Sequence, residues 1–163
     1  LDEALKRLAQ KYFRSHSPAS LEDFTWWSGL PKMQCKKAIE GIASELEEVL
    51  VESTPMYLYR NNFEGTNYTK TMHLLPPYDE YLIGYKSRWV ALDKKHEAKA
   101  HNKFGIFKPV ILHEGRVIGN WKASIDKQAT NLTTDLFTEK TKVRKRSLQE
   151  ATEQLVRFCK KDN

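Results

Sequence analysis

The chain has 163 residues, 40% of them hydrophobic, and a formal net charge of +6 at pH 7. This length holds one large or two small domains with a packed core. No window approaches the roughly 18 apolar residues of a membrane span, and the amino terminus lacks the pattern of a signal peptide. Cys35 and Cys159 fall on predicted apolar helix faces, where free thiols behave as small hydrophobes. We therefore expect a soluble, cytoplasmic protein that has no contact with a membrane.

The positive charge is concentrated in the second part of the chain. Residues 1–60 carry eight Lys or Arg against nine Asp or Glu, so the totals of 27 and 21 leave 19 against 12 for the rest. Phosphate neutralisation supplies most non-specific affinity for DNA. Electrostatic attraction to DNA would therefore come mainly from the second part of the chain.

The first predicted helix covers residues 2–15 and ends at the break His16-Ser17-Pro18. Its apolar positions follow the i, i+3, i+4, i+7 spacing of one helix face. They are Leu5, Leu8, Ala9 and Tyr12. The helix begins directly after Leu1, without a Met, so we expect the chain to be part of a longer polypeptide.

Residues 20–46 predict two helices joined by the tight turn Gly29-Leu30-Pro31. Ser20 and Asp23 form a capping box that begins the first of them. Gly29 tolerates the positive φ that follows a helix, and Pro31 fits the first turn of the next one. The apolar positions of the second helix share a narrow arc that we expect to be buried. They are Cys35, Ile39, Ile42 and Leu46.

The opposite face of this second helix is polar and partly basic, and carries Gln34, Lys37, Gly41 and Ser44. Such a helix-turn-helix is typical of one that lies in the major groove of DNA. A helical hairpin used only for packing explains the segment about equally well. Residues 48–52 and 56–59 have β propensity and flank a turn at 53–55. Three helices followed by a hairpin is the order of a winged helix.

The polar segment 61–70 predicts a linker between a first domain at 1–61 and a second at 71–163. In the second domain, alternating apolar residues around Glu114-Gly115 predict a β-hairpin. Residues 129–137 form a further candidate strand. After the basic run 140–146 we expect a closing helix with Ser147 as N-cap. Its apolar stripe is Leu148, Ala151, Leu155, Phe158 and Cys159.

Several side chains invite a chemical role but have a simpler explanation. Trp26 and Trp27 are expected in the core and in packing between domains rather than stacked on bases. His96 and His101 are five residues apart, which does not suit a helical metal site, so we predict no metal. The adjacent Asp79 and Glu80 cannot form a catalytic pair alone. We expect one of them to form an ion pair with one of the cations Lys86, Arg88 and Lys108.

Three segments together resemble a known family. They are LEDFTWWSGL (21–30), LLPPYDEYLIGYKSR (74–88) and GIFKPVILHEGRVIGNWK (105–122). They are similar to the carboxy-terminal part of a bacterial winged-helix DNA-binding family that includes DNA glycosylases able to unhook interstrand crosslinks. The resemblance covers nearly the whole chain. It implies an α+β fold, with a winged helix of three helices and a hairpin wing followed by a small β-barrel-like domain and a C-terminal helix.

The family's catalytic feature is a Gln-x-Gln or Gln-x-Asp pair that positions water and sugar during base excision. None of the glutamines of this chain has Gln or Asp two positions later. In the family the motif lies nearer the amino terminus. The resemblance therefore implies a DNA-repair fragment without catalytic residues, whose complete polypeptide is a candidate glycosylase. We expect no cofactor.

We expect double-stranded DNA and the upstream part of the same polypeptide as partners. The helix-side contact is predicted at Lys32, Gln34, Lys36 and Lys37, because a helix N-terminus favours phosphate. A second basic surface is predicted on the barrel at Tyr85, Arg88, Lys108 and Lys122. Two alternatives stay open: a winged helix that serves as a protein scaffold, and a transcription regulator. The acidic residues Glu40, Glu45, Glu47 and Glu48 argue against the regulator.

Overall fold

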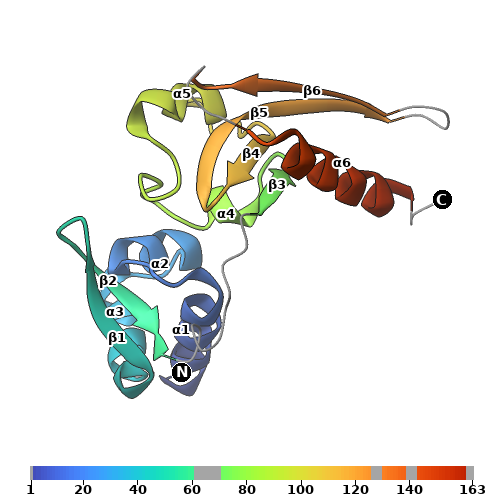
Figure 1. The fold of residues 1–163 in the computed structure, drawn as a ribbon. Helices are drawn as coiled ribbons and strands as arrows, with labels where there is room; N and C mark the ends of the chain where they lie inside the picture. Colours follow the sequence, from blue (N-terminus) through green and yellow to red (C-terminus); the bar gives the residue numbers. More distant parts are fainter. Residues whose placement is uncertain (1, 61–70, 126–129, 139–142, 161–163) are drawn as a thin grey trace. The chain divides into compact units, whose positions relative to one another are not determined.

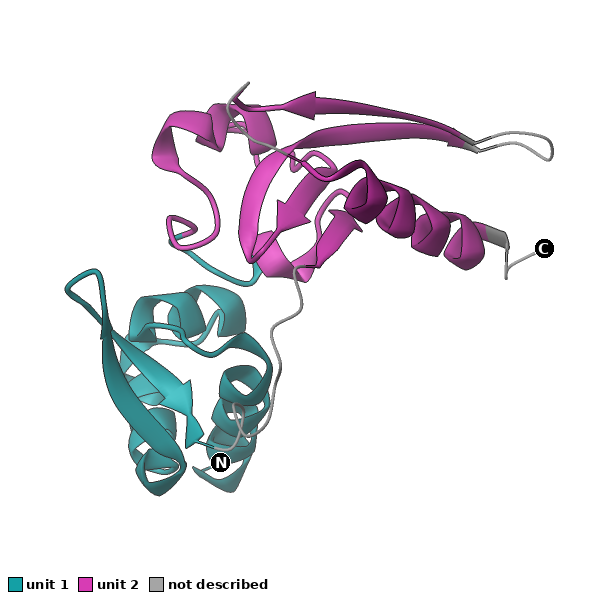
Figure 2. Ribbon diagram, viewed as in Figure 1, with its two compact units in different colours: residues 1–67, 83–87 teal, residues 68–82, 88–163 magenta. Residues whose placement is uncertain are grey.

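The computed structural model describes residues 2–60, 71–125, 130–138 and 143–160. The chain forms two compact units, coloured separately in Figure 2. Unit 1 comprises Leu1–Asn67 and Ile83–Ser87, and unit 2 comprises Tyr68–Leu82 and Arg88–Asn163. The predicted linker 61–70 and the start of the basic run, 140–142, lie outside the described residues.

Unit 1 begins with three helices, as the sequence predicted: α1 (Asp2–His16), α2 (Leu21–Ser28) and α3 (Lys32–Glu40) (Figure 1). The capping box at the start of α2 is present, and Gly29 ends that helix with φ 66°. Gly29, Leu30 and Pro31 form the whole connection to α3, which confirms the predicted turn.

The three helices share one hydrophobic core with the chain that follows them. Cys35 and Ile39 are buried as predicted, together with Ala38. Ile42 and Leu46 are also buried, but α3 ends at Glu40 and not at 46. Gly41 disfavours a longer helix because it loses the most conformational entropy. The chain then passes through the short helix η1 (Ala43–Glu45) into a strand.

Strands β1 (Leu46–Val51) and β2 (Thr54–Tyr59) form an antiparallel hairpin. Its turn is Glu52-Ser53, with φ of 45° and 67°, which is the two-residue turn that suits a twisted hairpin. The predicted turn at 53–55 is therefore displaced, because Thr54 pairs with Val51. Pro55 is tolerated in β2, since neither strand of a two-stranded sheet is central.

Residues 83–87 belong to unit 1, although the sequence placed them in the second domain. The Tyr12 hydroxyl donates to the Gly84 carbonyl, and the Tyr85 hydroxyl donates to the His16 carbonyl. Asp23 is 1% exposed and accepts the backbone N–H groups of Lys86 and Ser87 at 2.9 and 3.1 Å. These long-range bonds fix the segment against α1 and α2.

Unit 2 is built on a four-stranded antiparallel sheet in the order β3-β4-β5-β6. The strands are β3 (Met72–Leu75), β4 (Val110–His113), β5 (Arg116–Ile125) and β6 (Thr130–Leu136) (Figure 1). Glu114 and Gly115 form the β4–β5 turn with φ of 50° and 76°, which confirms the predicted hairpin. Among the described strands β3 does not pair with β6, so closure into a barrel is not observed.

Alternate residues of β4 serve two cores on opposite faces of the sheet. Val110 and Leu112 pack with Leu82, Leu92 and other residues of the 80–107 segment. This segment contains α4 (Glu80–Ile83), η3 (Lys94–His96) and α5 (Glu97–Ala100). Ile111 packs instead with Ala151 of the closing helix α6 (Lys145–Lys160). The alternation follows from the period of two in a strand.

The closing helix differs from its prediction at both ends. It begins at Lys145, so Ser147 lies inside the first turn and is not the N-cap. Leu148 and Ala151 pack against the sheet, but Phe158 is 72% exposed. Arg146 pairs with Glu150 at 2.8 Å, one helix turn further on.

We predict that Asp23→Asn lowers the free energy of unfolding by about 2–3 kcal/mol. Only one of the two polar atoms of an amide accepts hydrogen bonds, so its NH₂ group would face buried N–H or O–H donors. Chemical denaturation measures the change. The neighbouring exposed Glu22→Gln removes the same charge and is expected to cost less than about 1 kcal/mol. Equal effects of the two variants would contradict the structural role of Asp23.

Candidate nucleic-acid interface

The basic residues predicted on the second helix lie together on α3. Lys32, Lys36 and Lys37 are exposed, and Gln34 is half-buried. Lys32 and Lys36 are one turn apart, so they share a face. The buried side of the same helix holds Cys35, Ala38 and Ile39, which leaves the cations directed away from the core.

Two of these lysines already have carboxylate partners. Lys32 Nζ lies 2.8 Å from Glu22 Oε1, and Lys37 Nζ lies 2.8 Å from Asp2 Oδ1. The hydrogen bond from Lys32 lowers the pKa of Glu22, and that from Lys37 lowers the pKa of Asp2. Exposed ion pairs of this kind contribute little to stability. A phosphate could therefore replace either carboxylate at small cost.

A hollow of about 410 Å³ lies beside the start of α3. It is lined by Glu22, Thr25, Trp26, Gly29, Leu30, Lys32 and Lys86. Trp26 is 56% exposed, so the prediction that it packs in the core is wrong. Its indole Nε1–H donates to the Ile83 carbonyl at 3.1 Å, which satisfies the ring nitrogen. Trp27 is half-buried and packs against the core of unit 1, as expected.

Tyr85 and Arg88 do not belong to an exposed basic surface on the sheet. Tyr85 lies in unit 1 and donates its hydroxyl to the His16 carbonyl. Arg88 is half-buried, its Nε donates to the Leu82 carbonyl at 2.6 Å, and its guanidinium lies 5.0 Å from the centre of the Phe107 ring. These contacts give Arg88 a structural role inside unit 2. The short-range pattern of the sequence did not indicate them.

Lys108 and Lys122 are exposed and line one hollow of about 390 Å³ in unit 2. Its other lining residues come from β5 and β6: Asn120, Trp121, Thr133, Thr134 and Asp135. The structure therefore brings together two of the four residues predicted on this domain. Asp79 Oδ1 accepts the backbone N–H of Tyr81 at 2.9 Å at the start of α4, and the ion pair of Asp79 or Glu80 with a nearby cation stays a prediction.

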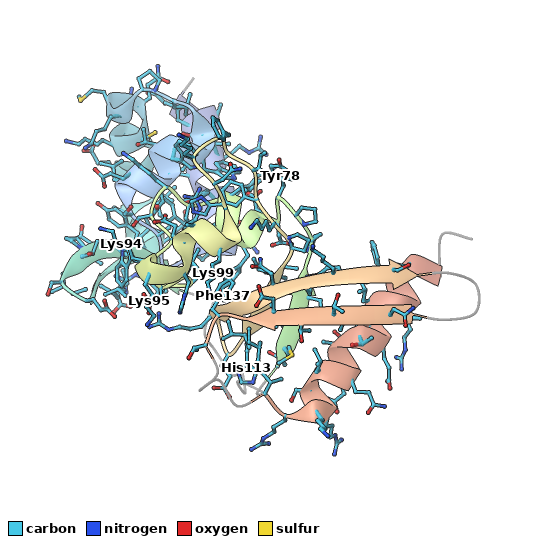
Figure 3. The ribbon with its side chains drawn as sticks, turned by 90° about the horizontal axis from the view of Figure 1, so that it is seen from above. Tyr78, Lys94, Lys95, Lys99, His113 and Phe137 are labelled. Carbon is cyan, nitrogen blue, oxygen red and sulfur yellow. The ribbon has the colours of Figure 1, made fainter. Side chains whose placement is uncertain are left out.

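Four further lysines lie in η3, in α5 and just after α5, and we name them the lysine cluster. They are Lys94, Lys95, Lys99 and Lys103. All four are exposed. Lys95 pairs with Asp93 at 2.6 Å and lowers the pKa of that carboxyl by its hydrogen bond. Lys99 Nζ lies 5.5 Å from the centre of the Phe137 ring. Figure 3 labels both side chains. The sequence does contain a signal for this cluster, because four of the ten residues 94–103 are lysines. From the sequence we considered only the two histidines of this segment and did not identify the lysines as a group.

The two histidines of this segment have separate surroundings. The His96 ring packs on Phe137 with centroids 5.1 Å apart. His101 stacks on Phe107, and its Nε2 lies 3.3 Å from Glu97 Oε1. In the part of the chain that the structure describes, no three His, Cys, Asp or Glu residues are grouped to hold a metal. Within the same ranges, no helix has the length and apolar character to cross a bilayer.

Comparison with known proteins gives a consistent result. Residues 1–158 match the family described as DNA glycosylase AlkZ-like. An interstrand DNA cross-link repair glycosylase of Streptomyces sahachiroi is 29% identical over 128 residues, which is 74% of this chain and 34% of that protein. The solved Streptomyces sahachiroi DNA glycosylase AlkZ superposes with a TM-score of 0.80 at 24% identity, over 96% of this chain and 43% of that one.

The superposition shows that this mixed fold of helices and antiparallel sheets is shared with a solved DNA glycosylase. The chain belongs to the AlkZ-like DNA glycosylase family. This confirms the resemblance seen in the sequence at the level of the family. The chain spans about a third of the length of the curated relative that it matches.

We predict that Lys32→Ala raises the pKa of Glu22 towards its ordinary value, because the variant removes the hydrogen bond that lowers it. NMR titration of the Glu22 carboxyl carbon measures this pKa. Lys36→Ala removes the same charge from the same helix and is expected to leave the pKa of Glu22 unchanged. The ion pair would be refuted if both variants gave the wild-type value.

Proposed function

We propose that this chain is a DNA-binding portion of a DNA glycosylase-like repair protein. Unit 1 acts as a winged helix, with α3 as the helix presented to the major groove and β1–β2 as the wing. The observation that carries the proposal is the division of α3 into a buried apolar side and an exposed side with three lysines. At nine residues α3 is about 13 Å long, which is comparable to the width of the major groove.

Unit 2 supplies the second group of phosphate contacts in this proposal. Lys108 and Lys122 line one hollow together with residues of β5 and β6, and the lysine cluster adds charge on and just after η3 and α5. Tyr85 and Arg88 are not part of the proposed interface, since their polar groups bond to backbone carbonyls. Family membership supports DNA as the partner.

We propose that the chain contributes no catalytic group to base excision. None of its glutamines has Gln or Asp two positions later, which is the spacing of the family's catalytic pair. The alternative, a winged helix that serves as a protein scaffold, is supported by the carboxylates that pair with Lys32 and Lys37. Electrophoretic mobility shift at graded salt separates the two, because a scaffold retains no duplex.

The double variant Lys36→Ala/Lys37→Ala is expected to weaken duplex binding. It should also make the slope of log affinity against log salt less steep, by about 0.9 for each phosphate that the protein no longer neutralises. Arg7→Ala/Lys11→Ala removes two exposed cations from α1 and serves as the matched control. We expect the control to keep the wild-type slope. An equal slope for both variants and the wild type would show that α3 does not bind the phosphates.

For unit 2 we predict that Lys108→Ala/Lys122→Ala also makes the slope of log affinity against log salt less steep, by about 0.9 for each phosphate contact that is lost. Arg88→Ala provides the contrast, because it removes a cation that is bound to the Leu82 carbonyl. This variant is expected to reduce stability and to leave the slope of the folded protein unchanged. A lower slope in Arg88→Ala alone would reverse the assignment.

A further inference from the structure

A short loop between α5 and β4 presents two large apolar side chains to solvent. Phe104 is 78% exposed, and Ile106 is 50% exposed. Among the described residues, Phe104 is the most exposed of the large hydrophobic side chains. The packing of unit 2 does not account for either side chain, because both lie outside its two cores.

The loop is held in one conformation by its own hydrogen bonds. Asn102 Oδ1 accepts the backbone N–H groups of Phe104 and Ile106 at 2.9 and 3.1 Å. The Asn102 N–H donates to the Ile106 carbonyl, and the Gly105 N–H donates to the Asn102 carbonyl, both at 3.1 Å. Gly105 has φ 76°, which a side chain would disfavour. The apolar tip is therefore preorganised, and little entropy is lost when it binds.

The base of the loop joins it to the body of unit 2. His101 and Phe107 form an antiparallel bridge, and their rings stack with centroids 4.9 Å apart. The Lys108 N–H donates to the Ala100 carbonyl at 2.9 Å. These contacts hold the base of the loop against the rest of unit 2.

Positive charge lies next to this tip, both in space and along the chain. Lys103 Nζ lies 5.2 Å from the centre of the Phe104 ring. Between 93 and 108 the chain carries five lysines against Asp93 and Glu97. The lysines are Lys94, Lys95, Lys99, Lys103 and Lys108. A surface with an apolar centre and a basic margin is complementary to stacked bases between phosphate backbones.

Another exposed apolar side chain shows that exposure alone does not carry this argument. Leu50 is 74% exposed on the β1–β2 hairpin. Its neighbours along the hairpin include Glu47, Glu48 and Glu52, which phosphates would repel. Charge therefore distinguishes the two tips, and nucleic acid suits the Phe104 tip.

We infer that Phe104 and Ile106 form a wedge that enters between adjacent base pairs of a DNA duplex. Phe104 stacks on the face of a base, Ile106 fills the opened step, and Lys103 contacts the flanking phosphate. Apolar wedges of this kind unstack a step and bend the duplex. The inference rests on the proposed DNA binding and adds to it a means of opening the base stack.

The test uses the full natural polypeptide and a short duplex with 2-aminopurine, whose fluorescence rises when it is unstacked. The wild type is expected to raise the fluorescence, and Phe104→Ala to abolish the rise. Base–aromatic stacking is worth about 1–3 kcal/mol, so Phe104→Ala should weaken binding by about fivefold or more. Its salt slope should stay unchanged, because the variant removes no cation. Phe104→Trp is expected to keep the wild-type affinity, because it keeps an aromatic ring for stacking.

Phe158→Ala removes another exposed phenylalanine, which lies on α6 outside the proposed interface. It is the matched control and should change neither fluorescence nor affinity. A wild-type fluorescence rise that persists in Phe104→Ala would overturn the wedge while DNA binding stood. Absence of salt-dependent binding by the wild type would instead refute the proposed function itself. A melting temperature that falls in Phe104→Ala without DNA would show that the tip packs against protein, which also overturns the wedge.

Discussion

The arrangement of unit 1 depends on a single buried carboxylate, that of Asp23. One of its oxygens accepts the Ser20 N–H and hydroxyl at 2.9 and 2.7 Å, and the other accepts the Lys86 and Ser87 N–H groups. A buried carboxylate is tolerated only when such donors replace water. The same side chain therefore fixes both the start of α2 and the position of a segment more than sixty residues later. Since the turn at Gly29 leads directly from α2 to α3, the lysine face of α3 also depends on this start.

Local signals in the sequence predicted most elements, and they failed where distant partners decide. The capping box, the Gly29 turn and the Glu114-Gly115 hairpin depend on neighbouring residues, and each is observed. The second pair of bonds to Asp23 was not predictable, because the donors at Lys86 and Ser87 carry no sequence pattern that points to it. Helix ends were also misjudged, since Gly41 ends α3 before its apolar spacing does.

The candidate site shows the same division between local and distant causes. The exposed lysines of α3 follow from helix periodicity, so the sequence was sufficient. The surroundings of Tyr85 and Arg88 depend on the carbonyls of His16 and Leu82, which no spacing rule connects to them. The lysine cluster is visible in the sequence as a local excess of charge, which the spacing of its two histidines does not reveal. For this segment, the local density of lysines was more informative about the surface than the spacing of possible metal ligands.

The ion pairs of Lys32, Lys37 and Lys95 bear on how this protein would discriminate among partners. Each cation lies close to one exposed carboxylate, so its field is partly cancelled in the free protein. An isolated anion gains little by displacing one carboxylate. Under the proposed DNA binding, a duplex would present regularly spaced phosphates. Once one phosphate had replaced the carboxylate at Lys32 or Lys37, the next would meet the other lysine at high effective concentration. Paired surface lysines thus favour an extended polyanion over single anions, and the carboxylates that weaken each contact contribute to this preference.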